Sequence, residues 1–263
     1  MTRSRVPPAA VVAAVIVVVA VIGVGIVAAR SGARERGVAG GPAGTFVALG
    51  DSVPAGSSCG CVAYPELIRV AASVARGGDA YLLNAAGGGL TSGDVLAAVR
   101  DDDRAVVTAL RRATTVFVTV GANDFGDDPA ATCPAGGACD RRVADAVQRN
   151  VTDVLARIAQ LSSGHARVFV TGYWGVFVDG AVAADRGTEF VTAARAVTLL
   201  ANDALRAAAT AGGATYVDLD AAFTSAAGPG NDRTSLLAAD GDHPNAAGHR
   251  VIADALLAVC ACA

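Results

Sequence analysis

Short apolar runs alternate with longer amphipathic segments along the chain from Thr45 onward. The short runs are rich in Val, Phe and Thr, as buried strands are, whereas the longer segments repeat apolar residues at helical spacing. The predicted strands are Thr45–Leu49, Ala80–Asn84, Thr114–Val120, Ala166–Gly172 and Ala214–Leu219. The predicted helices are Ala63–Arg76, Ser92–Arg112 with a break near residues 101–103, Arg141–Leu161, Thr188–Ala211 and Asn245–Val259. This alternation predicts β-α-β units, and therefore a mostly parallel sheet with helices on both faces.

The N-terminal part of the chain has a different pattern. The 21 residues from Ala9 to Ala29 are all Ala, Val, Ile or Gly. As a helix this segment would be about 31 Å long, close to the roughly 30 Å hydrocarbon thickness of a bilayer. The apolar core of a signal peptide is usually only about 7–15 residues long, so we expect an uncleaved transmembrane anchor. A cleaved signal peptide is the alternative, because Val27-Ala28-Ala29 has the small residues of a cleavage site.

These patterns divide the chain into four parts. Residues 1–8 form a short tail, and residues 9–29 form the anchor or signal segment. Residues 30–44 are rich in glycine and arginine and are expected to be a flexible linker. Residues 45–263 are long enough for one well-cored α/β domain.

The charge of the chain excludes several functions. Residues 1–44 carry five arginines and one glutamate, which leaves 16 arginines against 23 acids, a net charge of −7, in residues 45–263. A domain with this balance lacks the basic surface that nucleic-acid binding requires, so we expect no nucleic-acid partner. The chain has no lysine, which excludes a P-loop NTPase and Schiff-base chemistry.

The cysteines indicate where the domain works. An even number of cysteines outside the apolar segment is typical of disulfides formed in an oxidising exterior. We expect Cys133–Cys139 to be one bridge and leave the pairing of the other four open. The two C-x-C pairs could also bind metal, but no histidine lies at zinc-finger spacing from them. The six cysteines are Cys59, Cys61, Cys133, Cys139, Cys260 and Cys262.

The first predicted strand ends abruptly in Gly50-Asp51-Ser52, which places a serine on a tight turn. Ligands of parallel α/β sheets bind at the carboxyl ends of the strands, so Ser52 is a candidate nucleophile. A serine needs a base, an orienting acid and oxyanion donors to act at neutral pH. Ser58 lies in Gly56-Ser-Ser-Cys-Gly60, which fits the G-x-S-x-G motif, but it lacks the preceding strand that a nucleophile elbow requires.

Elimination among three histidines identifies a candidate base. His165 immediately precedes a strand and is therefore expected at the opposite edge of the sheet, and His249 falls inside the last predicted helix. His243 lies in a loop, and Asp240 is three residues earlier, a spacing that lets a turn bring its carboxylate to the imidazole Nδ1. Asp242 is a second candidate for the orienting acid. The alternative without catalysis is an acidic turn in which His243 caps the following helix.

Other polar groups follow the predicted strands. The backbone N–H groups of Ser52 and Gly89 and the side-chain amide of Asn123 are candidate oxyanion donors. Tyr173 and Trp174 follow the fourth strand and can line a substrate pocket, although packing in the core is an equally good interpretation of aromatic residues there.

The ordered blocks Gly50-Asp51-Ser52, Gly89, Gly121-x-Asn123-Asp124 and Asp240-x-x-His243-Pro244 resemble those of the SGNH (GDSL-type) hydrolase family. The resemblance covers nearly all of residues 45–263. It implies a flavodoxin-like, three-layer α/β/α fold with a five-stranded parallel sheet, and hydrolysis of esters or thioesters without a cofactor or metal. The roles that it implies are nucleophile for Ser52, base for His243, orienting acid for Asp240, and oxyanion donors for Ser52, Gly89 and Asn123.

We therefore expect a serine esterase or lipase-type hydrolase that acts through an acyl-enzyme outside the cytoplasmic membrane. The domain would be tethered by the apolar segment, or secreted if that segment is cleaved. One alternative is an acetyl esterase acting on cell-envelope glycans, and another is a membrane-tethered binding protein on the same fold without turnover. A metal-dependent hydrolase is the poorest alternative, because its carboxylates are scattered along the sequence. Its candidate ligands are Asp124, Asp127, Asp128, Asp240, Asp242 and His243.

Overall fold

The computed structural model describes residues 44–100, 104–129 and 134–262. The predicted tail and apolar segment, and all of the predicted linker except Gly44, lie outside the described residues. Among the helices in the described ranges, none combines the length and the apolar character needed to cross a bilayer.

Within the described residues, five parallel strands form a sheet with the order β2-β1-β3-β4-β5. The strands are β1 (Thr45–Gly50), β2 (Tyr81–Asn84), β3 (Thr115–Thr119), β4 (Arg167–Thr171) and β5 (Thr215–Val217). Each overlaps a strand predicted from the sequence, and the parallel pairing confirms the predicted β-α-β units. The strand order reverses direction between β1 and β3, which is where sheets of this kind bind their ligands.

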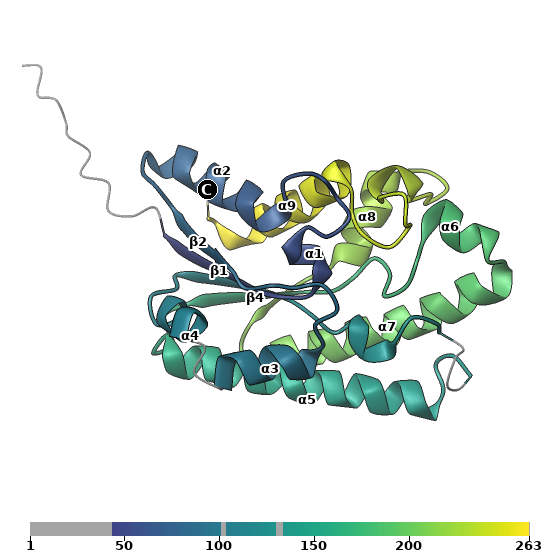
Figure 1. The fold of residues 1–263 in the computed structure, drawn as a ribbon, viewed down its shortest axis with the longest axis horizontal. Helices are drawn as coiled ribbons and strands as arrows, with labels where there is room; N and C mark the ends of the chain where they lie inside the picture. Colours follow the sequence, from purple (N-terminus) through teal and green to yellow (C-terminus); the bar gives the residue numbers. More distant parts are fainter. Residues whose placement is uncertain (1–43, 101–103, 130–133, 263) are drawn as a thin grey trace, which may run out of the picture. The chain divides into compact units, whose positions relative to one another are not determined.

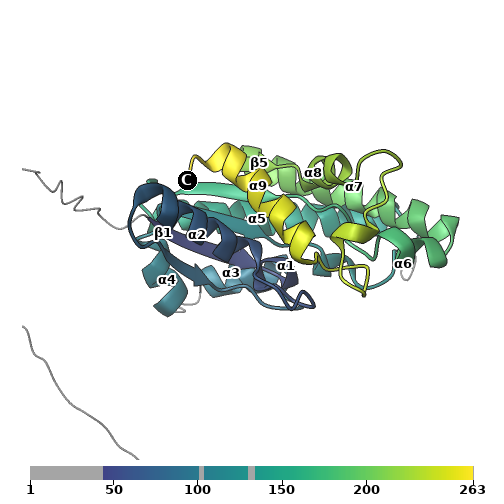
Figure 2. The same cartoon turned by 90° about the horizontal axis from the view of Figure 1, so that it is seen from above.

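Helices cover both faces of the sheet (Figures 1 and 2). One face carries α2 (Tyr64–Arg76), α8 (Leu219–Ala227) and α9 (Ala246–Cys260). The other carries α3 (Ser92–Arg100), α4 (Arg104–Leu110), α5 (Ala138–Leu161) and α7 (Thr188–Ala211). The remaining short helices are α1 (Ser52–Ala55), α6 (Gly180–Asp185), η1 (Asn123–Phe125) and η2 (Thr234–Leu236). The expected three-layer α/β/α fold is confirmed, whereas the hydrophobic pattern missed α1, α6 and α8 because they are short.

The core of the domain is built on the central strands. Because helices cover both faces, β1 and β3 are almost continuously apolar and buried. The rings of Phe46 and Phe117, on neighbouring strands, stack with their centroids 6.1 Å apart. The centroid of the Phe117 ring also lies 6.1 Å from that of Phe169 and 6.2 Å from that of Tyr64 in α2. This packing fixes the three central strands relative to one another.

The chain turns sharply where β1 ends. Gly50 has a φ of +148°, and a Cβ atom at this position would lie 1.9 Å from the carbonyl oxygen of Thr119 on β3. The next residue, Asp51, donates its backbone N–H to that same oxygen over 3.0 Å. Only glycine allows the two backbones to approach this closely.

Two disulfides join cysteines whose pairing could not be predicted from the sequence. Cys59 is bonded to Cys61, and Cys260 to Cys262. Cys133 lies outside the described residues, and so does the predicted Cys133–Cys139 bridge.

The contact at Gly50 generates a stability prediction. Gly50→Ala should lower the free energy of unfolding by about 3 kcal/mol or more, because the added methyl group must push β1 and β3 apart. Gly77→Ala is the matched control: Gly77 also has a positive φ, of +64°, but no atom lies within 4 Å of its added Cβ. That variant should lose only about 1 kcal/mol. Urea denaturation of both variants measures the difference, and equal losses would contradict the proposed clash.

Candidate active site

Ser52 begins α1 directly after β1, at the carboxyl edge of the sheet. Asp51 caps this short helix, since its Oδ1 accepts the backbone N–H of Val53 over 3.0 Å. The Ser52 side chain is half-buried. The turn therefore presents the Ser52 hydroxyl at the point where the strand order reverses.

His243 and Asp240 are joined in the loop before α9. The His243 Nδ1 lies 2.9 Å from Asp240 Oδ2, whereas the nearest Asp242 carboxylate oxygen is 3.7 Å away. Partial burial acts to raise the pKa of Asp240, but hydrogen bonds from the His243 backbone and ring, and from other donors, lower it to about 2. The carboxylate is thus ionised at neutral pH and holds the proton of His243 on Nδ1. Of the two acidic residues, Asp240 is therefore the one within hydrogen-bond distance of the His243 ring.

The loop that carries His243 is anchored by Asn245. The Asn245 side-chain oxygen accepts the N–H groups of Ala247 and Gly248 over 2.8 and 3.1 Å, so Asn245 caps α9. Its amide nitrogen donates to the carbonyl oxygens of Ser235 and Leu237, each over 2.9 Å. The alternative in which His243 caps the helix is therefore wrong, because Asn245 has that role.

Ser52, Asn123 and His243 line the same pocket, with a volume of about 170 Å³. The three residues come from the ends of β1 and β3 and from the loop before α9, so the fold brings together groups that are far apart in sequence. Asn123 lies in η1, and its Nδ2 donates to the carbonyl oxygen of Leu90 over 2.8 Å. The amide has a second N–H, which can serve a substrate oxygen.

Gly89 is positioned less directly. It has a φ of +78° in the loop between β2 and α3, and it does not belong to the described residues that line the pocket. The following residue, Leu90, is the one that accepts the Asn123 amide. The Gly89 loop therefore lies beside Asn123 but not on the pocket wall.

Tyr173 and Trp174 fit both interpretations made from the sequence. They are only 1% and 2% exposed, and the Trp174 ring stacks on Phe223 with centroids 4.2 Å apart. Both also line the pocket of Ser52 and His243. The Tyr173 hydroxyl donates to the buried Asp51 carboxyl group, which ties the loop after β4 to the turn after β1.

The other two histidines lie where the sequence placed them. His165 is exposed beside the N-terminal end of β4. His249 is fully buried in α9, where burial lowers its pKa to about 4, and its Nδ1 accepts the backbone N–H of Tyr64 over 3.3 Å. Neither belongs to the described lining of the pocket.

Ser58 has a role that sequence reasoning missed. It follows α1 rather than a strand, so it is not on a nucleophile elbow, as predicted. Its φ is +57°, and its hydroxyl forms a hydrogen bond with the carboxylate of Asp240. No local sequence pattern indicates this contact, because it joins the turn after α1 to the loop before α9.

The carboxylates of the metal-dependent alternative do not form a ligand cluster. Among the residues that the structure describes, the ligand atoms of three histidine, cysteine or acidic side chains converge within 4.8 Å only at Cys59, Cys61 and His249. Asp124 instead binds the start of α3, accepting the Ser92 N–H over 2.8 Å and the Ser92 hydroxyl over 2.6 Å. Among the described residues, the carboxylates near His243 therefore do not converge on a common metal position.

Asp51 generates a prediction about pH. Burial raises its pKa to about 7, against the opposing effect of the Tyr173 hydrogen bond. The folded state therefore keeps this proton when the unfolded chain has lost it, so this contribution to stability is full below about pH 4 and falls until about pH 7. Asp51→Asn cannot titrate at this position. The free energy of unfolding of the variant minus that of the parent should therefore rise by a few kcal/mol as the pH goes from 4 to 8. Urea denaturation across this pH range measures the difference, and parallel curves for the two proteins would contradict it.

Comparison with known proteins identifies the family. The family model of the GDSL-like lipase/acylhydrolase family matches residues 48–251. No curated protein sequence matches the chain.

Solved structures share the fold. The lipase Lip_vut3 from a goat rumen metagenome is 18% identical, with a TM-score of 0.62, over 81% of this chain and 95% of its own. Phospholipase A1 from Streptomyces albidoflavus NA297 is 24% identical, with a TM-score of 0.61, over 82% and 98% of the two chains. A catalytic mutant of Axe2, an acetylxylan esterase from Geobacillus stearothermophilus, is 17% identical, with a TM-score of 0.58, over 83% and 94%. Since the family match spans most of the domain, the chain belongs to the GDSL-like lipase/acylhydrolase family of SGNH hydrolases and is a hydrolase of ester bonds.

Proposed function

We propose that Ser52, His243 and Asp240 form a catalytic triad that cleaves carboxylic esters or thioesters through an acyl-enzyme. The observation that carries the proposal is the pocket itself. Ser52 and His243 line the same pocket, and Asp240 holds the His243 ring by a hydrogen bond of 2.9 Å. With the proton held on Nδ1, the His243 Nε2 is the nitrogen that can accept a proton from Ser52.

The reaction then takes two steps. His243 accepts the Ser52 proton as the hydroxyl oxygen attacks the substrate carbonyl, and it gives that proton to the departing alcohol or thiol. A water molecule, deprotonated by His243, hydrolyses the acyl-enzyme in the second step. The Asn123 amide and the backbone N–H of Ser52 stabilise the oxyanion, and the N–H of Gly89, in the loop beside Asn123, is the third proposed donor.

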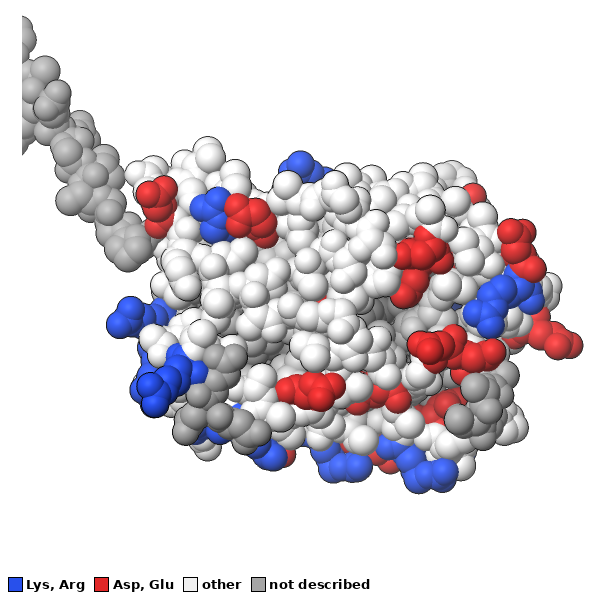
Figure 3. All heavy atoms as spheres, in the orientation of Figure 1, with Lys and Arg blue, Asp and Glu red and all other residues white. Residues whose placement is uncertain are grey.

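The surroundings of the pocket favour an uncharged ester larger than an acetyl group. A second hollow of about 200 Å³ shares Trp174, Gly175, Phe177 and Val178 with the first, which leaves room beyond a two-carbon acyl group. Asp127 and Asp242 line the first pocket, and acidic side chains gather toward the right of the view in Figure 3. Such an environment disfavours anionic substrates. Because the two hollows offer more space than an acetyl group needs, we place uncharged lipid-type esters ahead of acetylated glycans.

We also propose that the domain acts outside the cytoplasmic membrane. The uncharged segment from Ala9 to Ala29 has the length of a membrane anchor. The Cys59–Cys61 and Cys260–Cys262 disulfides suit an oxidising compartment. Tethering would keep the pocket near lipid substrates.

Hydrolysis of p-nitrophenyl esters of graded chain length tests the proposed triad. Ser52→Ala and His243→Ala should lower kcat by more than about 10³-fold, and Asn123→Ala by about 10²–10³-fold because an oxyanion donor is lost. His165→Ala is the control, because His165 is exposed at the other edge of the sheet. Full activity in Ser52→Ala would contradict the proposal. A fluorophosphonate that fails to label Ser52 would favour the binding-protein alternative, and strict preference for acetyl esters would favour the acetyl esterase.

Ser58 supplies a second test at the same site. Ser58→Ala removes one donor from Asp240, so the carboxylate should hold His243 less firmly and kcat should fall by about tenfold. KM should not change, because Ser58 is not in the described lining of the pocket. Ser225→Ala, on the exposed side of α8, is the control. A rise in KM with unchanged kcat would show that Ser58 contacts the substrate instead.

A further inference from the structure

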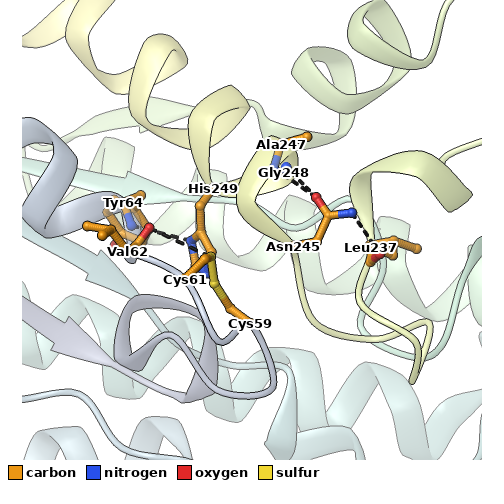
Figure 4. The surroundings of a disulfide bond; sticks show 9 residues. All are labelled: Cys59, Cys61, Val62, Tyr64, Leu237, Asn245, Ala247, Gly248 and His249. Carbon is orange, nitrogen blue, oxygen red and sulfur yellow. Dashed lines mark hydrogen bonds between the residues drawn. A yellow bond between two sulfur atoms is a disulfide. The ribbon is translucent and has the colours of Figure 1, made fainter. Parts of the chain in front are cut away.

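The Cys59-x-Cys61 pair meets a histidine that is distant in sequence. The two cysteines lie in the loop between α1 and α2, and His249 lies in the first turns of α9. Helices α2 and α9 pack side by side on the same face of the sheet. One ligand atom from each of Cys59, Cys61 and His249 lies within 4.8 Å of the other two. Figure 4 shows the imidazole ring beside the two sulfur atoms.

The environment of His249 indicates a ligand site. The side chain is fully buried, its Nδ1 accepts the Tyr64 N–H over 3.3 Å, and its Nε2 is buried without a hydrogen-bond partner. Buried polar atoms without a partner are rare, and a bound ion is one of the explanations for them. Here the unpartnered nitrogen belongs to the ring that adjoins two sulfur atoms.

We propose that, when Cys59 and Cys61 are reduced, they bind a transition-metal ion together with His249. Two thiolates and one imidazole form a donor set typical of Zn²⁺, Co²⁺ and softer ions. In a tetrahedral zinc site, bonds of about 2.3 Å to sulfur and 2.0–2.1 Å to nitrogen place the ligand atoms roughly 3.5–3.8 Å apart. Once the Cys59–Cys61 bond is broken, the two sulfur atoms can move apart to this spacing, and a ring nitrogen of His249 already lies within 4.8 Å of both. A water molecule or a small ligand would fill the fourth position.

The metal site can form only after the Cys59–Cys61 disulfide is reduced. A dithiol reductant supplies two electrons and two protons, the Cys59–Cys61 bond breaks, and the reductant becomes a disulfide. Binding of a divalent ion then releases the two thiol protons to solvent. Coordination through His249 Nε2 also places the ring proton on Nδ1, so the Tyr64 N–H loses its acceptor. That bond is long, at 3.3 Å, and is the one hydrogen bond exchanged for the metal bond.

The proposed metal site is separate from the ester-hydrolysing pocket but lies close to Ser58, which holds the Asp240 carboxylate. Cys59 follows Ser58, whose hydroxyl binds the Asp240 carboxylate. Neither Cys59, Cys61 nor His249 belongs to the described lining of the pocket. The ion would therefore fasten the loop between α1 and α2 to α9 without touching the substrate, and the proposal does not depend on the proposed triad.

The chain contains its own control. Cys260 and Cys262 have the same spacing and are also paired, at the other end of α9. No histidine joins them in a ligand cluster among the described residues. If C-x-C spacing alone were sufficient, the two pairs should bind metal equally well.

The test uses Co²⁺, whose thiolate complexes absorb in the near ultraviolet and visible ranges. The full chain, solubilised in mild detergent, is reduced with a dithiol, desalted under argon and titrated with Co²⁺ and then with Zn²⁺. We expect one Co²⁺ per chain with tetrahedral thiolate bands, which Zn²⁺ displaces. Cys260→Ser/Cys262→Ser and Cys139→Ser should keep this signal, and Cys59→Ser/Cys61→Ser should lose it. His249→Ala should weaken Co²⁺ binding by at least about tenfold.

Two measurements keep the test decisive if a variant folds poorly. Circular dichroism and ester hydrolysis report whether each variant is folded. X-ray absorption of the zinc-loaded parent protein should show two sulfur atoms and at least one imidazole nitrogen bound to the metal. The proposal is overturned if the reduced parent binds no Co²⁺, if the signal follows Cys260 and Cys262, or if the absorption spectrum lacks the imidazole.

Discussion

The close contact between the ends of β1 and β3 is the constraint on which the active site depends. Gly50 lets β1 pass against the Thr119 carbonyl, and the Asp51 N–H then binds that carbonyl over 3.0 Å. Tyr173, after β4, donates to the Asp51 carboxyl group. These contacts join three strand ends, so the turn that carries Ser52 is fixed to the loop that carries Asn123. The buried Asp51 is therefore part of the framework of the site.

The part of the site that contains His243 and Asp240 is held by a different set of contacts. His243 and Asp240 do not follow a strand but lie in a loop closed by the Ala238 N–H, which donates to the His243 carbonyl over 2.8 Å. Asn245 fixes this loop to the start of α9. Ser58 then links the loop to the turn after α1, through the hydrogen bond of its hydroxyl with Asp240. The orientation of His243, the proposed base, thus rests on hydrogen bonds among three separate segments.

The loop between α1 and α2 connects the active site to the cysteine cluster. At one end, Ser58 contacts Asp240. Next to it, the sulfur atoms of Cys59 and Cys61 lie within 4.8 Å of a ring nitrogen of His249. At both places the same loop packs against the C-terminal part of the chain. A loop held in this way can support the proposed triad without contributing a group that touches the substrate.

The sequence by itself determined the five strands, the parallel α/β fold and the candidates Ser52, His243, Asp240 and Asn123. Strand patterns and the polar turns after strands are local features, and a sheet of parallel strands brings those turns to one edge. The role of Ser58, the capping of α9 by Asn245 and the meeting of Cys59 and Cys61 with His249 depended on tertiary structure. Each of these joins segments whose proximity is set by helix packing, and zinc-finger spacing could not indicate a histidine supplied by another helix. Spacing in a sequence indicates contacts within one element, but only the packed fold decides which distant side chains share a site.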